Sequence, residues 1–377
     1  MMVRFIHTSD LHLGKPFGPF PEEVRAKLRS VRQDAISGLA VAAREGGAKY
    51  VLLAGDTFDA ETPKPTTIRH ALNAMREAED LTWILMPGNH DSLAASELWR
   101  VLANDKPANL QLAVDPKPLA LSDGVVILPA PCTVRHPGRD LTEWMDGATT
   151  GDAIRIGLAH GGIRDFRSGE ELSEERGTAI IPPDRAQRSD LTYLALGDWH
   201  GCLKISSSTW YSGTPEPDSF KPHEAAGALL VSIEGKAAPA QVTKIPLGSL
   251  TWCKTTLDTV AGEDLVQRHQ LALPLQNKRA STLLDITVTG RAGLQDRAAL
   301  ENAIQQAVPD FLWHVHDLSK LAVLHHTKDL DLIDVNGALR TAAEKLATEI
   351  DQAANEEEKK TASSALARLF SYAMEDE

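Results

Sequence analysis

The chain has 377 residues, which is more than one hydrophobic core usually serves, so at least two domains are expected. Its hydrophobic content of 42% supports a real core. Its formal net charge of -13 argues against a protein that coats nucleic acid through bulk positive charge, and a polyanionic partner would have to meet a local basic patch or bound cations. The sequence offers no uninterrupted apolar run of about 18 residues for a membrane span, and its three cysteines lack C-x-x-C spacing, which favours reduced thiols in the cytoplasm.

The N-terminal part of the chain predicts alternating strands and helices with polar residues at each strand end. Apolar runs at residues 3–8, 50–54 and 81–86 predict buried strands, and the periodicity of residues 22–45 and 66–79 predicts amphipathic helices between them. The three strands are followed by the sequences SDLHLG, GDTFD and GNHD. Because strands joined through a helix pair in parallel, their carboxyl ends meet at one edge of a sheet.

The same pattern of a strand followed by polar residues returns later in the chain. Strands predicted at residues 154–159 and 191–196 lead into HGG and GDWHG, and the polar stretch 164–188 between them predicts a long surface loop. An antiparallel run is expected to close the first domain near Gly248, formed by strands at residues 210–212, 228–233 and 242–245.

The C-terminal third of the chain predicts a small α+β domain and a helical tail. Half-buried strands are expected at residues 253–257, 283–288 and 311–315, with a helix at 295–308. His314 and His316 share one face of the last strand, a spacing that can bind metal, but a structural role is favoured because no third partner is in view. His7, inside the first strand, is expected to be a packed core residue.

Seven side chains of metal-binding type follow the five strand ends. They are Asp10, His12, Asp56, Asn89, His160, Asp198 and His200. This mixture of carboxylate, imidazole and amide oxygen without thiolate suits Mn, Fe or Zn in a dinuclear site and disfavours a structural zinc site or a calcium cage. Two cations about 3.5 to 4 Å apart can clamp a phosphate and ionise a bridging water.

The blocks DLH, GDTFD, GNHD, HGG and GDWH, in this order, resemble the five signature blocks of the calcineurin-like metallophosphoesterases. Their flanks HTSDLHLG, GDTFDAETP, ALGDWHG and YSGTPEP resemble the SbcD-type DNA repair exonucleases, and more closely the YhaO-like branch. The resemblance implies a four-layered α/β/β/α sandwich at residues 1–248. Position alone suggests an α+β capping domain at 249–336 and a helical tail at 337–377.

Carried over residue by residue, the resemblance implies two metal sites that share Asp56. The first would be formed by Asp10, His12, Asp56 and His200, and the second by Asp56, Asn89, His160 and Asp198. His90 would stabilise the developing charge or protonate the leaving oxygen, and Asp59 matches the position that orients this histidine.

Asp198 departs from the nuclease pattern, in which the last block usually reads G-H-x-H. A third carboxylate balances more of the charge of two divalent cations. We therefore expect a site that favours harder ions such as Mn and attracts an anionic phosphodiester less strongly.

The resemblance implies a metal-dependent DNA exonuclease or endonuclease of DNA repair with two divalent ions, most of all Mn, with Fe or Zn as alternatives. It also implies an SbcC-like coiled-coil ATPase partner, which the tail could dock unless it folds back on its own domain, and a homodimer. A phosphodiesterase or phosphatase for nucleotides or other small phosphoesters, and a weakly active DNA-binding scaffold subunit, stay open as alternatives.

Several side chains near the predicted active edge could contact DNA, although scattered surface arginines are the commoner explanation and Trp199 could equally be a packing residue. They are Lys15, Arg135, Arg164 and Trp199, with His136, Arg139 and Arg167 as further cations.

Overall fold

A computed structural model describes residues 2–122, 124–164, 180–221, 226–260, 262–324, 333 and 337–375. The chain divides into two compact units, one formed by Met1–Pro217 with Lys221–Ser249 and the other by Asp218–Phe220 with Leu250–Glu377. Within the described ranges, no helix has the length and apolar character needed to cross a membrane. The roles expected for these parts, a nuclease domain, a cap and a docking tail, stay predictions.

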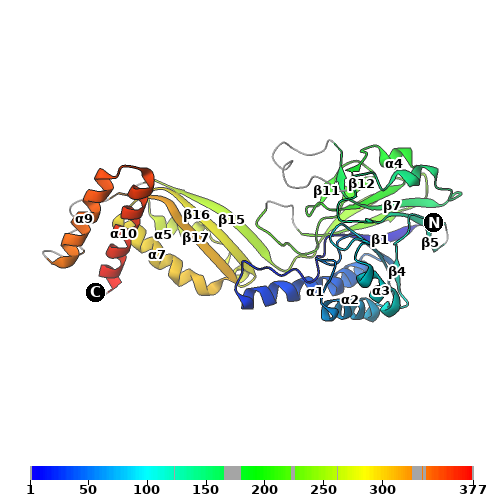
Figure 1. Ribbon diagram of the computed structural model, residues 1–377, viewed down its shortest axis with the longest axis horizontal. Coiled ribbons are helices and arrows are strands. Elements are labelled where there is room, and N and C mark those ends of the chain that lie inside the picture. The colour runs from blue at the N-terminus through cyan, green and yellow to red at the C-terminus, as the bar shows by residue number, and fades with distance from the viewer. Residues whose placement is uncertain are drawn as a thin grey trace. The chain divides into compact units, whose positions relative to one another are not determined.

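The first unit contains a mainly parallel sheet in the strand order β14-β13-β1-β2-β3-β4. Its parallel strands are β1 (Val3–Thr8), β2 (Tyr50–Ala54), β3 (Thr82–Met86) and β4 (Leu110–Leu112). Its antiparallel strands are β13 (Gly227–Ile233) and β14 (Gln241–Pro246). The outer face is covered by the helices α1 (Glu22–Glu45), α2 (Pro65–Glu77) and α3 (Ser96–Asp105) (Figure 1).

A second sheet of this unit has the order β11-β12-β10-β7-β6-β5. Its strands are β5 (Leu119–Ser122), β6 (Val125–Ala130), β7 (Ile154–His160), β10 (Tyr193–Gly197), β11 (Leu203–Lys204) and β12 (Thr209–Tyr211). The short elements η1 (Glu143–Gly147), β8 (Gly162–Ile163), β9 (Ile180–Ile181) and α4 (Arg185–Arg188) complete this half. The sequence predicts that the strands at residues 210–212, 228–233 and 242–245 form one antiparallel group, and this prediction is wrong for the first of them. Strand β12 pairs in parallel with β10 in the second sheet, whereas β13 and β14 extend the first sheet.

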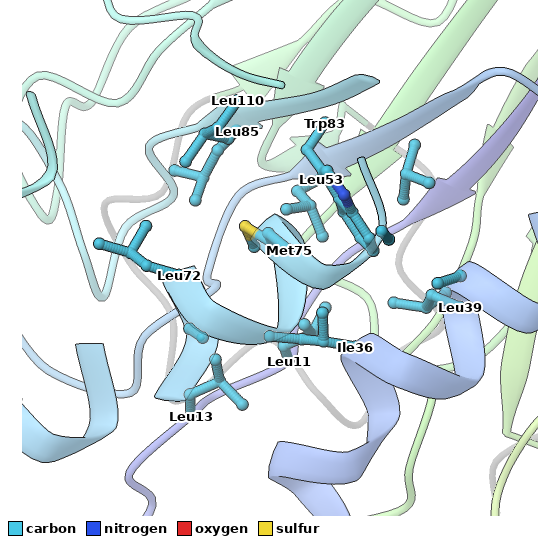
Figure 2. Close-up of a cluster of buried hydrophobic side chains, with 14 of the residues drawn as sticks. Leu11, Leu13, Ile36, Leu39, Leu53, Leu72, Met75, Trp83, Leu85 and Leu110 are labelled. Atoms are coloured by element: carbon cyan, nitrogen blue, oxygen red, sulfur yellow. The ribbon is translucent and has the colours of Figure 1, made fainter. Parts of the chain in front are cut away.

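The four-layered sandwich predicted from the sequence is confirmed, because side chains on opposite faces of a central strand pack into two different cores. In β2, Val51 and Leu53 belong to the core beneath the helices, whereas Leu52 belongs to the core between the sheets. Figure 2 shows Ile36 of α1 and Met75 of α2 beside Leu53 and Trp83 in the helix-side core. Because both faces are buried, the strand is apolar at every position, and the polar side chains gather only where it ends.

His7 is a buried residue of β1, as the sequence predicts, with both ring nitrogens bonded. Its Nδ1 lies 2.9 Å from the Tyr193 hydroxyl, and its Nε2 lies 3.1 Å from the Leu196 carbonyl oxygen. Since the carbonyl can only accept, Nε2 carries the proton and Nδ1 accepts from the tyrosine. Burial lowers the pKa of His7 to about 3, against the opposing effect of the bond to Leu196.

Acid should therefore destabilise the protein partly through His7. Between pH 6.5 and 3 the unfolded chain binds a proton at His7 that the folded chain does not, so the free energy of unfolding falls as the pH falls. We expect about 2 kcal/mol of loss from this residue by pH 5. Urea unfolding at pH 7.5 and pH 5 should show a smaller pH-dependent loss for His7→Gln than for the parent. An equal loss in both proteins would contradict the assignment, and exposed His136→Gln is the control.

The second unit is built on three parallel strands in the order β15-β16-β17: Thr251–Thr259, Thr282–Gly293 and Trp313–Leu324. Its helical elements are α5 (Leu265–Ala272), α6 (Gln276–Arg279), α7 (Leu294–Ala307), η2 (Val308–Asp310), α9 (Ala338–Gln352) and α10 (Glu356–Glu375). Helices α5 and α7 lie on one face of this sheet (Figure 1), where Leu265 and Leu300 pack in the same core as Ile286.

The helical tail has an apolar face that is packed within this second unit. Leu366 and Phe370 of α10 share a buried cluster with Leu294 of α7, and α9 lies against α10. The structure therefore has the tail folded back on its own unit, one of the two arrangements expected from the sequence, and docking of a partner stays a prediction.

Candidate active site

The loops that follow the parallel strands β1 and β2 are joined by main-chain hydrogen bonds. The Asp10 N–H donates to the Gly55 carbonyl at 3.2 Å, and the His12 N–H donates to the Asp56 carbonyl at 2.9 Å. In the second sheet β7 and β10 are also parallel neighbours, and their ends carry His160 and Asp198. Residues far apart in sequence are thus brought together at strand ends, as the repeated strand pattern predicts.

One group of ligand atoms comes from Asp10, His12 and His200, which lie within 4.8 Å of one another. The Nε2 atoms of His12 and His200 are 3.2 Å apart. Burial lowers the pKa of His12 well below its usual value, and the nearby His200 and Arg32 lower it further. The neutral ring, with its Nδ1 3.2 Å from an Asp59 carboxylate oxygen, has the Nε2 lone pair that a cation requires.

A second group combines Asp10, Asp56 and His160, also within 4.8 Å. His160 Nδ1 donates to the Ala54 carbonyl at 2.8 Å, which directs Nε2 to within 2.9 Å of the Asn89 Oδ1. The same Nε2 lies 3.8 Å from an Asp198 oxygen. Burial opposes a charge on this ring, but Asp56, Asp10 and Asp198 raise the pKa of His160 to about 9. The carboxylates thus favour a positive charge at this point.

Asp56 connects the two groups. Its Oδ2 lies 3.7 Å from His12 Nε2 and 3.5 Å from His160 Nε2, and its side chain is about 3% exposed. Burial raises the pKa of Asp56 well above its usual value, and the nearby Asp91 and Asp10 raise it further. A buried carboxylate repelled by its neighbours needs a cation in reach. The donor set therefore fits divalent metal ions, with Asp56 placed to bridge.

Several of these ligands lie on a backbone that ordinary residues avoid. The φ angles of Asp10, His12, Asp56 and Asp198 are 55°, 44°, 53° and 102°. Such left-handed conformations cost energy outside glycine and concentrate at functional sites. Close packing adds to the constraint, because a Cβ on Gly88 would lie 2.1 Å from Asp56 Oδ1. The glycine of GNHD is thus needed for the approach of the β3 loop to the Asp56 carboxylate.

The family model of the calcineurin-like phosphoesterases matches residues 3–188, a range that holds Asp10, His12, Asp56, Asn89 and His160. The chain contains a calcineurin-like phosphoesterase domain. Domains of this family are metal-dependent phosphoester hydrolases, and the clustered ligands agree with that chemistry. Asp198 and His200 follow the matched range, and they join the phosphoesterase site through contacts with His160, Asp10 and His12.

Among solved structures, the chain is similar to TT1561 of Thermus thermophilus. The identity is 13%, the match covers 65% of this chain and 99% of that chain, and the TM-score is 0.39. A similarity at this level carries no argument about activity or substrate. No curated protein matches the chain.

In the phosphoesterase domain, His90 lies beside the Asp56 carboxylate. Its main-chain N–H donates to Asp56 Oδ1 at 2.8 Å, and its Nδ1 lies 2.9 Å from the Asp59 carbonyl oxygen. A carbonyl accepts, so this contact places the proton on Nδ1. The contact that fixes the His90 tautomer comes from the main chain of Asp59, whereas the Asp59 carboxylate contacts His12. The residue predicted to orient His90 thus contacts both histidines, through different groups.

Two buried residues of the phosphoesterase domain support the site and were not singled out from the sequence. Arg32 of α1 donates to the carbonyl oxygens of Leu11 and Asp10 at 2.8 and 2.9 Å, and to that of Glu216 at 2.9 Å. Asp91 accepts from the Gly88 N–H at 2.7 Å and from the Phe58 N–H at 3.0 Å. Asp91 could have been found as the last residue of GNHD. Arg32 lies in a helix pattern and gave no such signal.

Most of the side chains proposed for substrate contact are exposed at the surface. Arg135 and Arg164 are exposed, Lys15 is half-buried with Nζ 5.9 Å from the Phe17 ring, and Trp199 is 38% exposed. His136 and Arg139 are exposed as well, and Arg167 lies outside the described residues. Contact of any of these with a substrate stays a prediction.

Proposed function

We propose that this chain is a metal-dependent DNA nuclease of DNA repair that hydrolyses phosphodiester bonds as an exonuclease or endonuclease. The observation that carries the proposal is the set of three overlapping ligand groups that share Asp10, His12 and Asp56, one of which contains His90. The general chemistry of the domain is phosphoester hydrolysis. The choice of DNA rests on the flanking sequences that resemble SbcD-type nucleases, with exposed Arg135 and Arg164 as cations for a phosphate backbone.

The roles proposed for the ligand residues are those that the family resemblance implies. The first ion would be held by Asp10, His12, Asp56 and His200, and the second by Asp56, Asn89, His160 and Asp198. Two divalent ions, when bound, supply an activated water and stabilise charge on the phosphoryl oxygens. The Asp59 carbonyl holds His90 with its proton on Nδ1, so Nε2 is the nitrogen that would exchange a proton with the leaving oxygen.

Manganese is the metal we propose, with Fe or Zn as alternatives, because Asp198 adds an oxygen ligand where SbcD-type enzymes have nitrogen. Asp198→His should shift metal preference toward softer ions and raise the affinity for a phosphodiester about fivefold, on the order of 1 kcal/mol. Competition between Mn and Zn, read as metal content, and KM for bis-p-nitrophenyl phosphate measure the two effects. Unchanged metal preference, metal content and turnover would refute the role assigned to Asp198.

The partners of this nuclease are proposed from the same resemblance. They are DNA and an SbcC-like coiled-coil ATPase, with a homodimer of this chain as a further assembly. Cys132, Cys202 and Cys253 form no disulfide with one another, which agrees with the cytoplasmic location proposed.

The deciding experiment incubates the manganese-loaded protein with end-labelled single- and double-stranded DNA, beside mononucleotides and bis-p-nitrophenyl phosphate. We expect DNA cleavage that His90→Gln lowers by about 10²-fold or more. Turnover of mononucleotides without DNA cleavage would favour the small-molecule enzyme. Full metal content without turnover of any substrate would favour the scaffold, and either result would overturn the nuclease assignment.

A further inference from the structure

The second unit contains a cluster of three histidines on the helix-covered side of its sheet. His314 and His316 are two positions apart in β17, so their side chains leave the strand on the same face. His269 comes from α5, and its Nε2 lies 3.1 Å from His316 Nε2. The ring centroids are 5.3 Å apart for His269 and His316, and 5.6 Å for His314 and His316. The third partner that the sequence did not reveal is thus supplied by the helix.

These rings differ from a histidine that serves packing alone. His7 has hydrogen-bond partners for both ring nitrogens, whereas the buried Nδ1 atoms of His269, His314 and His316 have none among the residues the structure describes. His269 is fully buried. When two neutral rings meet through Nε2, only one proton can lie between them, so the ring that accepts carries its proton on a buried Nδ1 without an acceptor.

The cluster is also in the right charge state to bind a cation. Burial lowers the pKa of His269 and of His314, and it lowers the pKa of His316 to about 4 with help from the other two rings. All three imidazoles are therefore neutral near pH 7, which is the form that ligates metals. His314 and His316 are half-buried, so an ion can reach the cluster from solvent.

We propose that His269, His314 and His316 form a further metal site, outside the phosphoesterase domain, for a transition-metal ion of the zinc, nickel or copper type. Two nitrogens bound to one tetrahedral ion at about 2.05 Å lie about 3.3 Å apart, close to the 3.1 Å between His269 and His316. Among the described residues, the ligand atoms of the three rings do not all lie within 4.8 Å of one another, so the proposal requires the His314 side chain to rotate toward the other two rings. Imidazole without carboxylate favours these ions over Mn and Mg. The site is separate from the phosphoesterase ligands and does not depend on the proposed nuclease activity.

The test uses the untagged full chain, saturated with Zn²⁺, freed of loose metal and analysed for zinc per chain. We expect the double variant His314→Gln, His316→Gln to hold one equivalent less than the parent, whereas His70→Gln, a variant of an exposed histidine on α2 in the first unit, holds the same amount. Substitution of Co²⁺ should give a visible absorption band for tetrahedral nitrogen coordination that the double variant lacks. Phosphoester turnover with manganese should be the same in all three proteins.

The variant Asp56→Asn distinguishes metal bound at the histidine cluster from metal bound at the active site. It should lower the metal held by the phosphoesterase domain and leave the cobalt band of the histidine cluster in place. Equal zinc content and equal cobalt spectra in the parent and the double variant would overturn the proposal. If the double variant does not fold, His314→Gln alone decides in the same way, because this ring is half-buried and its loss leaves the contact between His269 and His316 intact.

Discussion

Asparagine in place of Asp56 should reduce phosphoester hydrolysis by about 10³-fold or more while leaving the metal-free protein at least as stable as the parent. The carboxylate is the one ligand common to both predicted metal sites, so its loss weakens both. The stability effect has the opposite sign because burial and the nearby Asp91 and Asp10 raise the pKa of Asp56. Removing a disfavoured buried charge relieves that repulsion, and the asparagine oxygen can still accept from the His90 N–H.

Metal content, turnover of bis-p-nitrophenyl phosphate and the thermal midpoint of the metal-free protein measure these effects. Asp190→Asn is the matched control, because Asp190 also has a left-handed φ of 49° but is exposed and pairs with Lys236 at 3.3 Å. The control should keep full activity. Normal metal content and turnover in Asp56→Asn would show that Asp56 does not bridge.

Methionine in place of Arg32 should lower the free energy of unfolding by about 3 to 5 kcal/mol, and with it metal affinity. The guanidinium is 2% exposed and bonds carbonyl oxygens of two loops that are distant in sequence, at Leu11 and Glu216. Its loss removes the Arg32 donor from the buried Leu11 carbonyl and leaves the Glu216 and Asp10 carbonyls to share the single Thr214 hydroxyl, and an unsatisfied buried acceptor costs about 1 to 3 kcal/mol. The loop that carries Asp10 then loses a support on the helix side.

Urea unfolding and metal titration test this prediction. Arg29→Met is the control on the same helix, because Arg29 is partly exposed and pairs with Glu22 at 2.6 Å, a contact of small value. Arg32→Lys should be intermediate, since one ammonium cannot replace three directed bonds. An Arg32→Met protein as stable as Arg29→Met would contradict the bracing role.

The sequence was sufficient to predict the parts of the site that follow strand ends. Apolar runs such as residues 50–54 are buried on both faces, and this pattern identifies the central strands and places the polar residues that follow them at one edge. Asp10, His12, Asp56 and His160 were found in this way and lie together. The sheet to which β12 belongs could not be predicted, because a three-residue strand carries no information on its neighbour.

The features of the site that could not be predicted depend on contacts between residues that are far apart in the sequence. Arg32 meets Glu216, His269 meets His316, and Asp59 uses its carbonyl for one histidine and its carboxylate for another. None of these pairings produces a periodic pattern in the sequence. Each joins a side chain to a main-chain atom or a ring that comes near only when the chain is folded. Supporting residues are therefore harder to predict than ligands, whose spacing relative to strands repeats.

The left-handed backbone at Asp10, Asp56 and Asp198 limits how this centre can change during evolution. Apart from glycine, asparagine is the residue that tolerates this conformation best, and it is also a single-nucleotide neighbour of aspartate that discards the charge. Descendants that abandon catalysis but keep the architecture should therefore show Asn or Gly at these positions rather than a random assortment. Homologues that have lost catalysis should therefore be recognisable in sequence by a small set of substitutions at these positions.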